Sequence, residues 1–557
     1  MLKRSVILLA LLTLLVLPPH RGIGSGRITD RITHHLHQRI VTRDVSSRIF
    51  CRKEFLCGSS LLPRFYNERN FRPGWIDESG LTIQAESLIQ MIHAAHLEGL
   101  TPEDYHLVSI ESLVRHLRTT KNWRHNDEFL IDLEILLSDA FLIYASHLLS
   151  GRVDPETIHS KWIAATRRAD LIQLLHTALA TQSVDSTLKS LRPSHPGYGK
   201  LRNALKYYRH IAAAGGWRPI PPGPKMAIRS KDRRVEMVRR RLVLTGDLTP
   251  GSQADPRHFD SDLKEAVRTY QKRHGLIVDG IVGPETLGCL NTPPKELVRK
   301  IILNLERWRW LPHDLGWSHI NVNIADFRLD VIENDRSLMD IKVVVGSNYR
   351  RSPVFSGTMT YLVVNPYWYI PTSIVREDIY PMVRDNAHYL DEKKIRVFEN
   401  WHEDAREIAP ALVDWTGLET ERFTYKLRQD PGPHNALGRI KFMFPNKFAV
   451  YLHDTPYRHL FEKNSRNFSA GCIRVEKPIE LATYLLRGHS MWAGQTIDEL
   501  IESGERQVIH LPREIPVHLL YWTTWVDSDG LIHFRDDIYE RDEALYGALL
   551  ERAPTHY

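Results

Sequence analysis

Cysteine is scarce in this chain, which excludes a scaffold held together by disulfides. Only four cysteines occur among 557 residues, whereas small disulfide-stapled domains are dense in them. Cys51 and Cys57 lie close enough in sequence to pair in an oxidising compartment if their geometry allows. Cys289 is then expected to be a buried residue, and Cys472 remains as the candidate reactive thiol.

Other features are missing as well, and each absence removes a class of function. No segment beyond the N-terminus is long and apolar enough to span a membrane. The histidines are scattered rather than set at metal-ligand spacing, and no glycine-rich loop could cradle a phosphate. The net charge of +7 is dispersed, without a basic and aromatic stripe. We therefore expect no metal, no organic cofactor and no nucleic-acid partner.

The length and composition indicate a soluble protein of several domains. A chain of 557 residues exceeds what one hydrophobic core normally serves, so two to four domains are expected. Hydrophobic residues make up 42% and charged residues 25%, as in ordinary globular proteins. The positive net charge suits an exported protein that works near anionic polymers or membranes.

The N-terminus has the pattern of an export signal. Basic residues in MLKRS precede an apolar run from Val6 to Leu17, which is nearer the length of a signal-peptide core than of a membrane span. No Ala-x-Ala site follows, although residues 24–26 are small. Residues 1–26 are thus expected to be a signal peptide, either cleaved or retained as a membrane anchor.

Helical patterns dominate residues 48–215, which we interpret as a scaffold domain. Apolar residues recur at helical spacing from Leu88 to Leu97, and Gly99 with Pro102 ends that helix. Further helices are expected over 129–149, 169–179 and 198–214. The stretch at 216–232 is rich in proline and glycine, so it is read as a linker.

Residues 233–292 carry a compact pattern of helices and tight turns. Helices are expected over 233–244 and 260–274, followed by glycines 275, 280 and 283 and by Pro284 at a helix start. The run Tyr-Gln-x-x-x-Gly-Leu-x-x-Asp-Gly-x-x-Gly-x-x-Thr resembles the three-helix peptidoglycan-binding module. Such a module either binds glycan or simply braces its neighbour.

The sequence from residue 300 to 540 favours a β-rich domain. Strands are expected over 319–324, 327–331, 341–345 and 360–364, and a closing hairpin over 517–534. Residues 373–435 interrupt this pattern with helical and polar sequence. Because plain connections are rarely that long, we interpret this stretch as an inserted subdomain that caps the site. Asn365 and Trp368, just before it, are candidate substrate contacts or core residues.

A histidine and a cysteine near the C-terminus form the strongest chemical signal. His453 ends the apolar run FAVYL, read as a strand, and lies 19 residues before Cys472. Cys472 follows the small-residue turn Ser469-Ala470-Gly471 and precedes Arg474. A free thiol has a pKa of about 8.5, so a nucleophilic cysteine needs a base or a positive field nearby. His453 is the candidate base, and Arg474 is part of the field. Taken alone, Cys472 is better explained as a small buried hydrophobic residue and His453 as a core histidine with its hydrogen bonds satisfied.

The combination of His453 and Ser-x-Gly-Cys-apolar-Arg resembles the active-site signature of the YkuD-type L,D-transpeptidases, which cross-link peptidoglycan through a cysteine. The segments FYNERNFRPGW and HLEGLTPEDY resemble the helical N-terminal region of the large Gram-negative members. One departure is Ala470, where many members have a second histidine. Because nucleophile and base are both present, we interpret this as a variant of the turn.

The resemblance implies an α+β multidomain fold: a mainly helical N-terminal scaffold, a small three-helix peptidoglycan-binding module and a β-rich L,D-transpeptidase catalytic domain with an inserted capping subdomain. It also implies a periplasmic enzyme with peptidoglycan tetrapeptide stems as donor and acceptor, release of a terminal D-alanine and inhibition by carbapenems. Contact with the membrane is expected only through an uncleaved N-terminus. The alternatives are a cysteine-dependent murein peptidase and a non-catalytic wall-binding protein.

Specific roles follow for the residues around the thiol. Cys472 is the expected nucleophile and His453 the base, while the N–H groups of Cys472 and Gly471 form the oxyanion hole. A backbone carbonyl is expected to orient His453, since the adjacent Asp454 points to the other face of a strand. A helix at 478–486 is expected to begin near the nucleophile and lower its pKa. The expected substrate contacts are Tyr451, Arg474, Ser469, Asn365 and Trp368.

Overall fold

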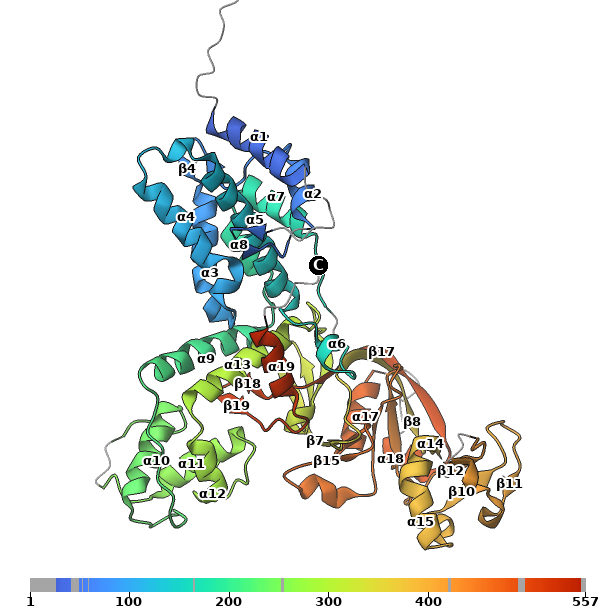
Figure 1. Ribbon diagram of the computed structural model, residues 1–557. Helices are drawn as coiled ribbons and strands as arrows, with labels where there is room; N and C mark the ends of the chain where they lie inside the picture. The colour runs from blue at the N-terminus through green and yellow to red at the C-terminus, as the bar shows by residue number, and fades with distance from the viewer. Residues whose placement is uncertain are drawn as a thin grey trace, which may run out of the picture.

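The computed structural model describes residues 27–551, apart from 42–49, 53, 59, 164–165, 252–254, 419–421 and 489–495. The expected export signal, 1–26, lies outside the described residues. None of the helices in the described part of the chain is long and apolar enough to cross a membrane. In Figure 1 a helical N-terminal part lies above a sheet, with α10–α12 at the lower left and β10–β12 at the lower right.

The N-terminal helices surround one long buried helix. Its apolar residues lie on all sides of α5 (Asp127–Ser150), so 130–148 are buried throughout, and Gly151 ends the helix at φ +89°. Cys51 packs against α5, with its thiol 3.4 Å from Asp132 Oδ1, and no disulfide joins it to Cys57. The other elements are α1 (Ile28–Val41), α2 (Leu62–Glu68), α3 (Ile83–His93), α4 (Leu107–Thr119), α6 (Pro155–Ile158), α7 (Leu171–Ala180), α8 (Val184–Ser190) and the short pairs β1 (Phe50–Cys51) with β2 (Glu54–Phe55) and β3 (Ile76–Asp77) with β4 (Gly80–Leu81).

The last helix of the expected scaffold domain packs against the C-terminal half of the chain. Apolar residues of α9 (Pro196–Ala213) share a core with α13 (Pro294–Arg309) and with the hairpin β18 (Thr524–Val526) and β19 (Ile532–Phe534), rather than with the N-terminal cluster. This differs from the expectation of one helical unit over 48–215. The hairpin itself is where the Asp-Gly turn predicted it, but the strand expected from 517 splits, and its first part joins the main sheet.

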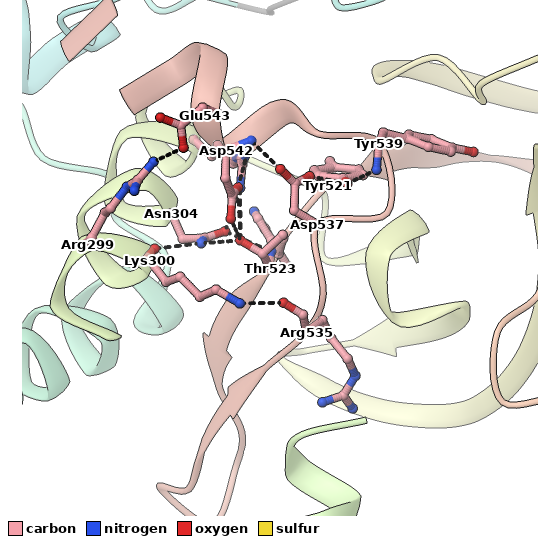
Figure 2. Close-up of polar contacts among 12 residues, drawn as sticks. Arg299, Lys300, Asn304, Tyr521, Thr523, Arg535, Asp537, Tyr539, Asp542 and Glu543 are labelled. Atoms are coloured by element: carbon pink, nitrogen blue, oxygen red, sulfur yellow. Dashed lines mark hydrogen bonds and ion pairs between the residues drawn. The ribbon is translucent and has the colours of Figure 1, made fainter. Parts of the chain in front are cut away.

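The helices α10 (Arg233–Leu244), α11 (Ser261–Arg273) and α12 (Pro284–Leu290) enclose a small core of their own. Two arginines tie this group to the rest of the chain. Arg273 donates to the Ile532 carbonyl (3.0 Å), and Arg535 donates to the Arg273 carbonyl (2.7 Å) and to Asp326 (2.5 Å). Lys300 of α13 donates to the Arg535 carbonyl (3.1 Å; Figure 2). The three-helix group is therefore docked on the hairpin.

A nine-stranded sheet forms the largest core of the C-terminal half. The strand order is β15-β7-β16-β14-β13-β8-β17-β5-β6, and because β6 also pairs with β7, all strands except β15 close into a ring. The helices α17 (Pro478–Leu486), α18 (Ile497–Glu502) and α19 (Arg541–Leu550) pack against it. The strands are β5 (Ser318–Asn323), β6 (Arg328–Glu333), β7 (Arg336–Gly346), β8 (Phe355–Val364), β13 (Ile440–Met443), β14 (Leu452–His453), β15 (Asn467–Ser469), β16 (Ile473–Val475) and β17 (Gln507–Leu520).

The segment between β8 and β13 folds around a separate core. Its four-stranded sheet has the order β11-β10-β12-β9, and buried apolar residues from Ile370 to Leu427 fill it. In Figure 1 this unit stands apart from the main sheet. Its elements are β9 (Trp368–Tyr369), α14 (Thr372–Ile374), the π-helical turn η5 (Val375–Ile379), α15 (Tyr380–Asp385), α16 (Tyr389–Glu392), β10 (Ile395–Phe398), β11 (Glu407–Ile408) and β12 (Lys426–Gln429).

Candidate active site

A cavity of about 640 Å³ surrounds Cys472 and His453. Its walls include the turn before Cys472, the loop between β7 and β8, the start of the inserted unit, and residues of β14, of β16 and of the segment before β13. The loop contributes Tyr349 and Arg350, and the insertion contributes Glu377 and Asp378. Arg350 links these two walls, since its guanidinium donates to Glu377 (2.8 Å) and to Asp378 (2.9 Å).

Strand pairing brings the histidine next to the cysteine. β14 and β16 are parallel neighbours, with Leu452 opposite Ile473 and His453 opposite Arg474. On the other side, β13 pairs antiparallel with β14 and places Lys441 opposite His453. Paired positions on neighbouring strands share a face of the sheet. His453 is therefore flanked by two cations. The expected strand over FAVYL and His453 is reduced to Leu452 and His453, because the chain turns at Ala449, which has φ +51°.

The backbone fixes which nitrogen of His453 carries the proton. Nδ1 lies 2.5 Å from the Asp454 carbonyl oxygen, and only an N–H can donate to that acceptor. The Asp454 carboxylate is used elsewhere: it accepts from the Arg439 N–H (2.9 Å) and pairs with Arg458 (3.4 Å). This agrees with the expectation that a backbone carbonyl orients the ring. Nε2 is then left unprotonated and able to accept a proton.

Burial keeps the Cys472 thiol and the His453 imidazole neutral. Burial, together with the charges of Arg474 and Lys441, lowers the pKa of His453 to about 3. Burial likewise raises the pKa of the Cys472 thiol, against the opposing effects of a hydrogen bond from Tyr451 and of Lys441. At neutral pH the pair is thus a thiol and a neutral imidazole rather than a thiolate and an imidazolium.

The side chain of Ser469 holds the turn that carries the Cys472 thiol. Ser469 Oγ accepts from the Gly471 N–H (3.1 Å) and donates to the Cys472 carbonyl (2.5 Å). The expectation that the Gly471 N–H belongs to the oxyanion hole is therefore wrong, because Ser469 already occupies it. The Cys472 N–H makes no hydrogen bond with the described residues. Gly471 has φ +120°, where a side chain would strain the backbone.

The expected substrate contacts divide into two groups. Tyr451, Arg474, Trp368 and Ser469 line the cavity. Asn365 does not: its side chain is buried and its amide donates to the carbonyls of residues 500, 501 and 505. Its role in this geometry is to anchor the chain behind α18, so the expectation of a substrate contact is not supported.

The helix expected beside the nucleophile has the predicted bounds but lies elsewhere. The strand β16 leads away from Cys472 before α17 begins at Pro478. Three residues of strand span about 10 Å, and no residue of α17 lines the cavity. The N-terminal amides of α17 therefore cannot stabilise the thiolate or an oxyanion.

Sequence reasoning missed two charged residues of the site. Lys441 stands 3.8 Å over the Tyr451 ring, and burial lowers the pKa of its amine while the nearby Cys472 acts in the opposite direction. Arg350 joins the β7–β8 loop to the insertion. Neither belongs to a local motif, because both reach the site through strand pairing or a loop far away in sequence.

Comparison with known proteins identifies the domain that contains this site. Residues 318–495 match the family model described as the L,D-transpeptidase catalytic domain, YkuD. The chain carries a YkuD-type L,D-transpeptidase domain. Residues 231–290 match the "Putative peptidoglycan binding domain", which covers α10–α12, and residues 60–205 match a scaffold domain. The order of a helical region, a peptidoglycan-binding domain and a β-rich transpeptidase domain agrees with the expected architecture.

Individual relatives cover parts of the chain. A "Putative L,D-transpeptidase" of Haemophilus influenzae is 32% identical over 249 residues, which are 45% of this chain and 49% of the relative. The N-acetylmuramoyl-L-alanine amidase CwlM of Mycobacterium tuberculosis is 38% identical over 73 residues, 12% of this chain and 18% of that protein. The chain thus spans about half the length of the first of these relatives.

Among solved structures, an L,D-transpeptidase from Mycobacterium smegmatis is 12% identical, with a TM-score of 0.18, over 36% of this chain and 58% of that one. The assignment of the transpeptidase domain rests on the family match.

The neutral state of the pair predicts a pH profile for thiol reactivity. Because the thiol pKa is raised, the thiolate fraction at Cys472 grows by about tenfold per pH unit between pH 6 and 8. Alkylation by iodoacetamide, followed at the Cys472 peptide by mass spectrometry, should rise in the same proportion. The Cys472→Ser variant corrects for the other cysteines. A rate that is already level below pH 7 would instead show a preformed thiolate and imidazolium pair.

Proposed function

We propose that this protein forms peptidoglycan cross-links by acyl transfer through Cys472, and releases a terminal D-alanine from a tetrapeptide stem. The observation that carries the proposal is that the pairing of β14 with β16 brings a neutral His453 and Cys472 into the lining of one cavity of about 640 Å³. The transpeptidase domain and the peptidoglycan-binding domain support it.

The first step forms a thioester. The Cys472 sulfur attacks the carbonyl carbon that precedes the terminal D-alanine, and its proton passes to Nε2 of His453. The carbonyl oxygen takes up the negative charge and accepts a hydrogen bond from the Cys472 N–H. When the C–N bond breaks, Nε2 returns the proton to the leaving amine. D-alanine departs, and the rest of the stem stays bound to sulfur.

The second step transfers the acyl group. The side-chain amine of a second stem, of the diaminopimelate type, attacks the thioester carbonyl and gives a proton to Nε2 of His453. The C–S bond then breaks, and the same proton returns to the sulfur. An amide joins the two stems, and the enzyme regains its neutral pair, so no proton or electron is left over.

Arg474 connects substrate binding to the activation of the base. Its charge is the second-largest cause of the low pKa of His453, after burial. The terminal carboxylate of the donor stem is the group that a half-buried guanidinium in this cavity would bind. Once paired with a carboxylate, Arg474 no longer disfavours protonation of the ring. The pKa of His453 then rises when the donor is in place, and the imidazole becomes a better base.

The inserted unit and the peptidoglycan-binding domain position the substrate and the enzyme. The inserted unit contributes Trp368, Glu377 and Asp378 to one wall of the cavity, so we assign it the role of a cap over the bound stem. The peptidoglycan-binding domain, docked on the hairpin, holds the enzyme on its polymer. On this basis we propose that the protein works in the periplasm, where peptidoglycan lies.

Product analysis tests the proposal against its alternatives. Purified protein incubated with disaccharide-tetrapeptide should give a dimer lighter by one D-alanine, identified by mass. Cys472→Ser and His453→Ala should each abolish this product, because one lacks the nucleophile and the other the base. The matched control is His459→Ala, which removes a histidine that does not line the cavity.

Other products point to other functions. A stem shortened by one D-alanine without any dimer would make the protein a murein peptidase in which water resolves the thioester. No product from the wild type, together with retention on purified sacculi, would favour a non-catalytic wall-binding protein.

The role of Arg474 predicts discrimination at the donor carboxylate. A tetrapeptide whose terminal carboxyl is amidated should react with the wild type about 10- to 100-fold more slowly, because the half-buried charge of Arg474 is then left without its carboxylate partner. Arg474→Met should lower the rate with the normal stem and remove most of the preference. Equal rates for the two stems with the wild-type enzyme would assign the carboxylate to another residue.

A further inference from the structure

A buried serine outside the Cys472 motif is bonded to the turn that carries the nucleophile. Ser352 lies in the β7–β8 loop and is fully buried. Its hydroxyl accepts from the Gly346 N–H (2.9 Å) and donates to the Gly471 carbonyl (2.8 Å). That carbonyl belongs to the peptide group whose nitrogen is the backbone N–H of Cys472. Ser352 thus joins the end of β7 to the peptide bond beside the reactive thiol.

The hydrogen bond to the Gly471 carbonyl also fixes the direction of the Cys472 N–H. In a planar trans peptide the C=O and N–H point in opposite directions. Ser352 holds the Gly471 oxygen toward the protein interior, so the Cys472 N–H points the other way, where it makes no hydrogen bond with the described residues. Cys472 itself lines the cavity. The N–H is therefore held toward the space in which the substrate carbonyl must lie.

Tyr539 in turn restrains Ser352 through hydrogen bonds. The Tyr539 hydroxyl donates to the Gly346 carbonyl (2.6 Å) and accepts from the Ser352 N–H (3.2 Å). Figure 2 shows where Tyr539 is anchored: its backbone N–H donates to the Tyr521 hydroxyl (2.9 Å), which donates to Asp537 (2.5 Å). Tyr539 is fully buried and stacks on Tyr521. These bonds leave Ser352 little freedom to rotate.

The loop also has no room to adjust. A Cβ on Gly346 would lie 2.1 Å from the Arg350 carbonyl oxygen and 2.6 Å from the Ser352 nitrogen, both backbone atoms. The chain therefore passes itself at close range at the point where Ser352 is held. Ser469 secures the other side of the turn, since its carbonyl accepts from the Ser347 N–H (2.9 Å).

We propose that Ser352, held by Tyr539, is a positioning residue that aims the Cys472 N–H at the substrate oxyanion. The inference rests on the proposed function, since only acyl transfer develops charge on a carbonyl oxygen. Loss of the Ser352 hydroxyl frees the Gly471 carbonyl, and the peptide group can then rotate away from the orientation needed for catalysis. Direct removal of one oxyanion donor costs about 100- to 1,000-fold in rate, so an indirect loss through Ser352 should cost less.

Two reagents distinguish a role of Ser352 in positioning the oxyanion donor from a general disturbance of the site. A carbapenem acylates the thiol through an attacked carbonyl and an oxyanion, whereas iodoacetamide alkylates the same thiol without one. Ser352→Ala should lower the limiting rate of carbapenem acylation about 10- to 100-fold, with the half-saturating concentration nearly unchanged. The rate of Cys472 alkylation by iodoacetamide, and its pH profile, should stay within about twofold of the wild type. Tyr539→Phe should show a smaller loss with the same selectivity.

Ser138→Ala is the matched control. Ser138 is also a fully buried serine with two hydrogen bonds, to Trp75 and Tyr66, but it lies in α5 among the N-terminal helices. Its loss should lower the melting temperature and leave both reactions unchanged.

The outcomes distinguish the inference from the function on which it rests. A wild type that is not acylated by the carbapenem contradicts the proposed function itself. If the wild type reacts and Ser352→Ala reacts equally fast, the positioning role alone is wrong. A parallel loss of acylation and alkylation would also overturn it, because it would show a merely structural role. If Ser352→Ala does not fold, Tyr539→Phe decides between the same results.

Discussion

The parallel pairing of β14 with β16 is the constraint on which the site depends. It sets the strand that ends in His453 beside the strand that follows Cys472, so both residues line one cavity although 19 residues separate them in the chain. Because side chains alternate along a strand, a slip of one residue would turn His453 to the opposite face. The neighbours of this pair prevent such a slip: β13 fixes β14 from one side, and β7 fixes β16 from the other.

Enclosure by the sheet also sets the chemistry. It keeps the thiol and the imidazole neutral, with the pKa of His453 near 3 and that of Cys472 above its usual value. A neutral thiol is less reactive than a thiolate. Activation then depends on charges that the substrate brings to Arg474. The oxyanion donor, by contrast, is already in place before the substrate arrives, since its direction comes from backbone hydrogen bonds.

The sequence predicted those features that local patterns determine. The bounds of α10 and α17 and the hairpin at the Asp-Gly turn rest on short motifs, and so does the choice of Cys472 and His453, which line one cavity. The expectations that the structure does not support concern residues whose contacts come from distant segments of the chain. The Gly471 N–H is occupied by Ser469, Asn365 holds the backbone near α18, and α17 begins beyond a strand. Lys441 and Ser352 reach the site through pairing and loop packing that no local motif reveals.

The most direct test of the account is the location of the acyl group during turnover. After a rapid acid quench of enzyme with disaccharide-tetrapeptide, digestion and tandem mass spectrometry should find the stem, less one D-alanine, on the peptide that contains Cys472. The adduct should disappear when an acceptor amine is added before the quench. An adduct on another residue, or cross-linked product formed without any adduct on Cys472, would contradict the account.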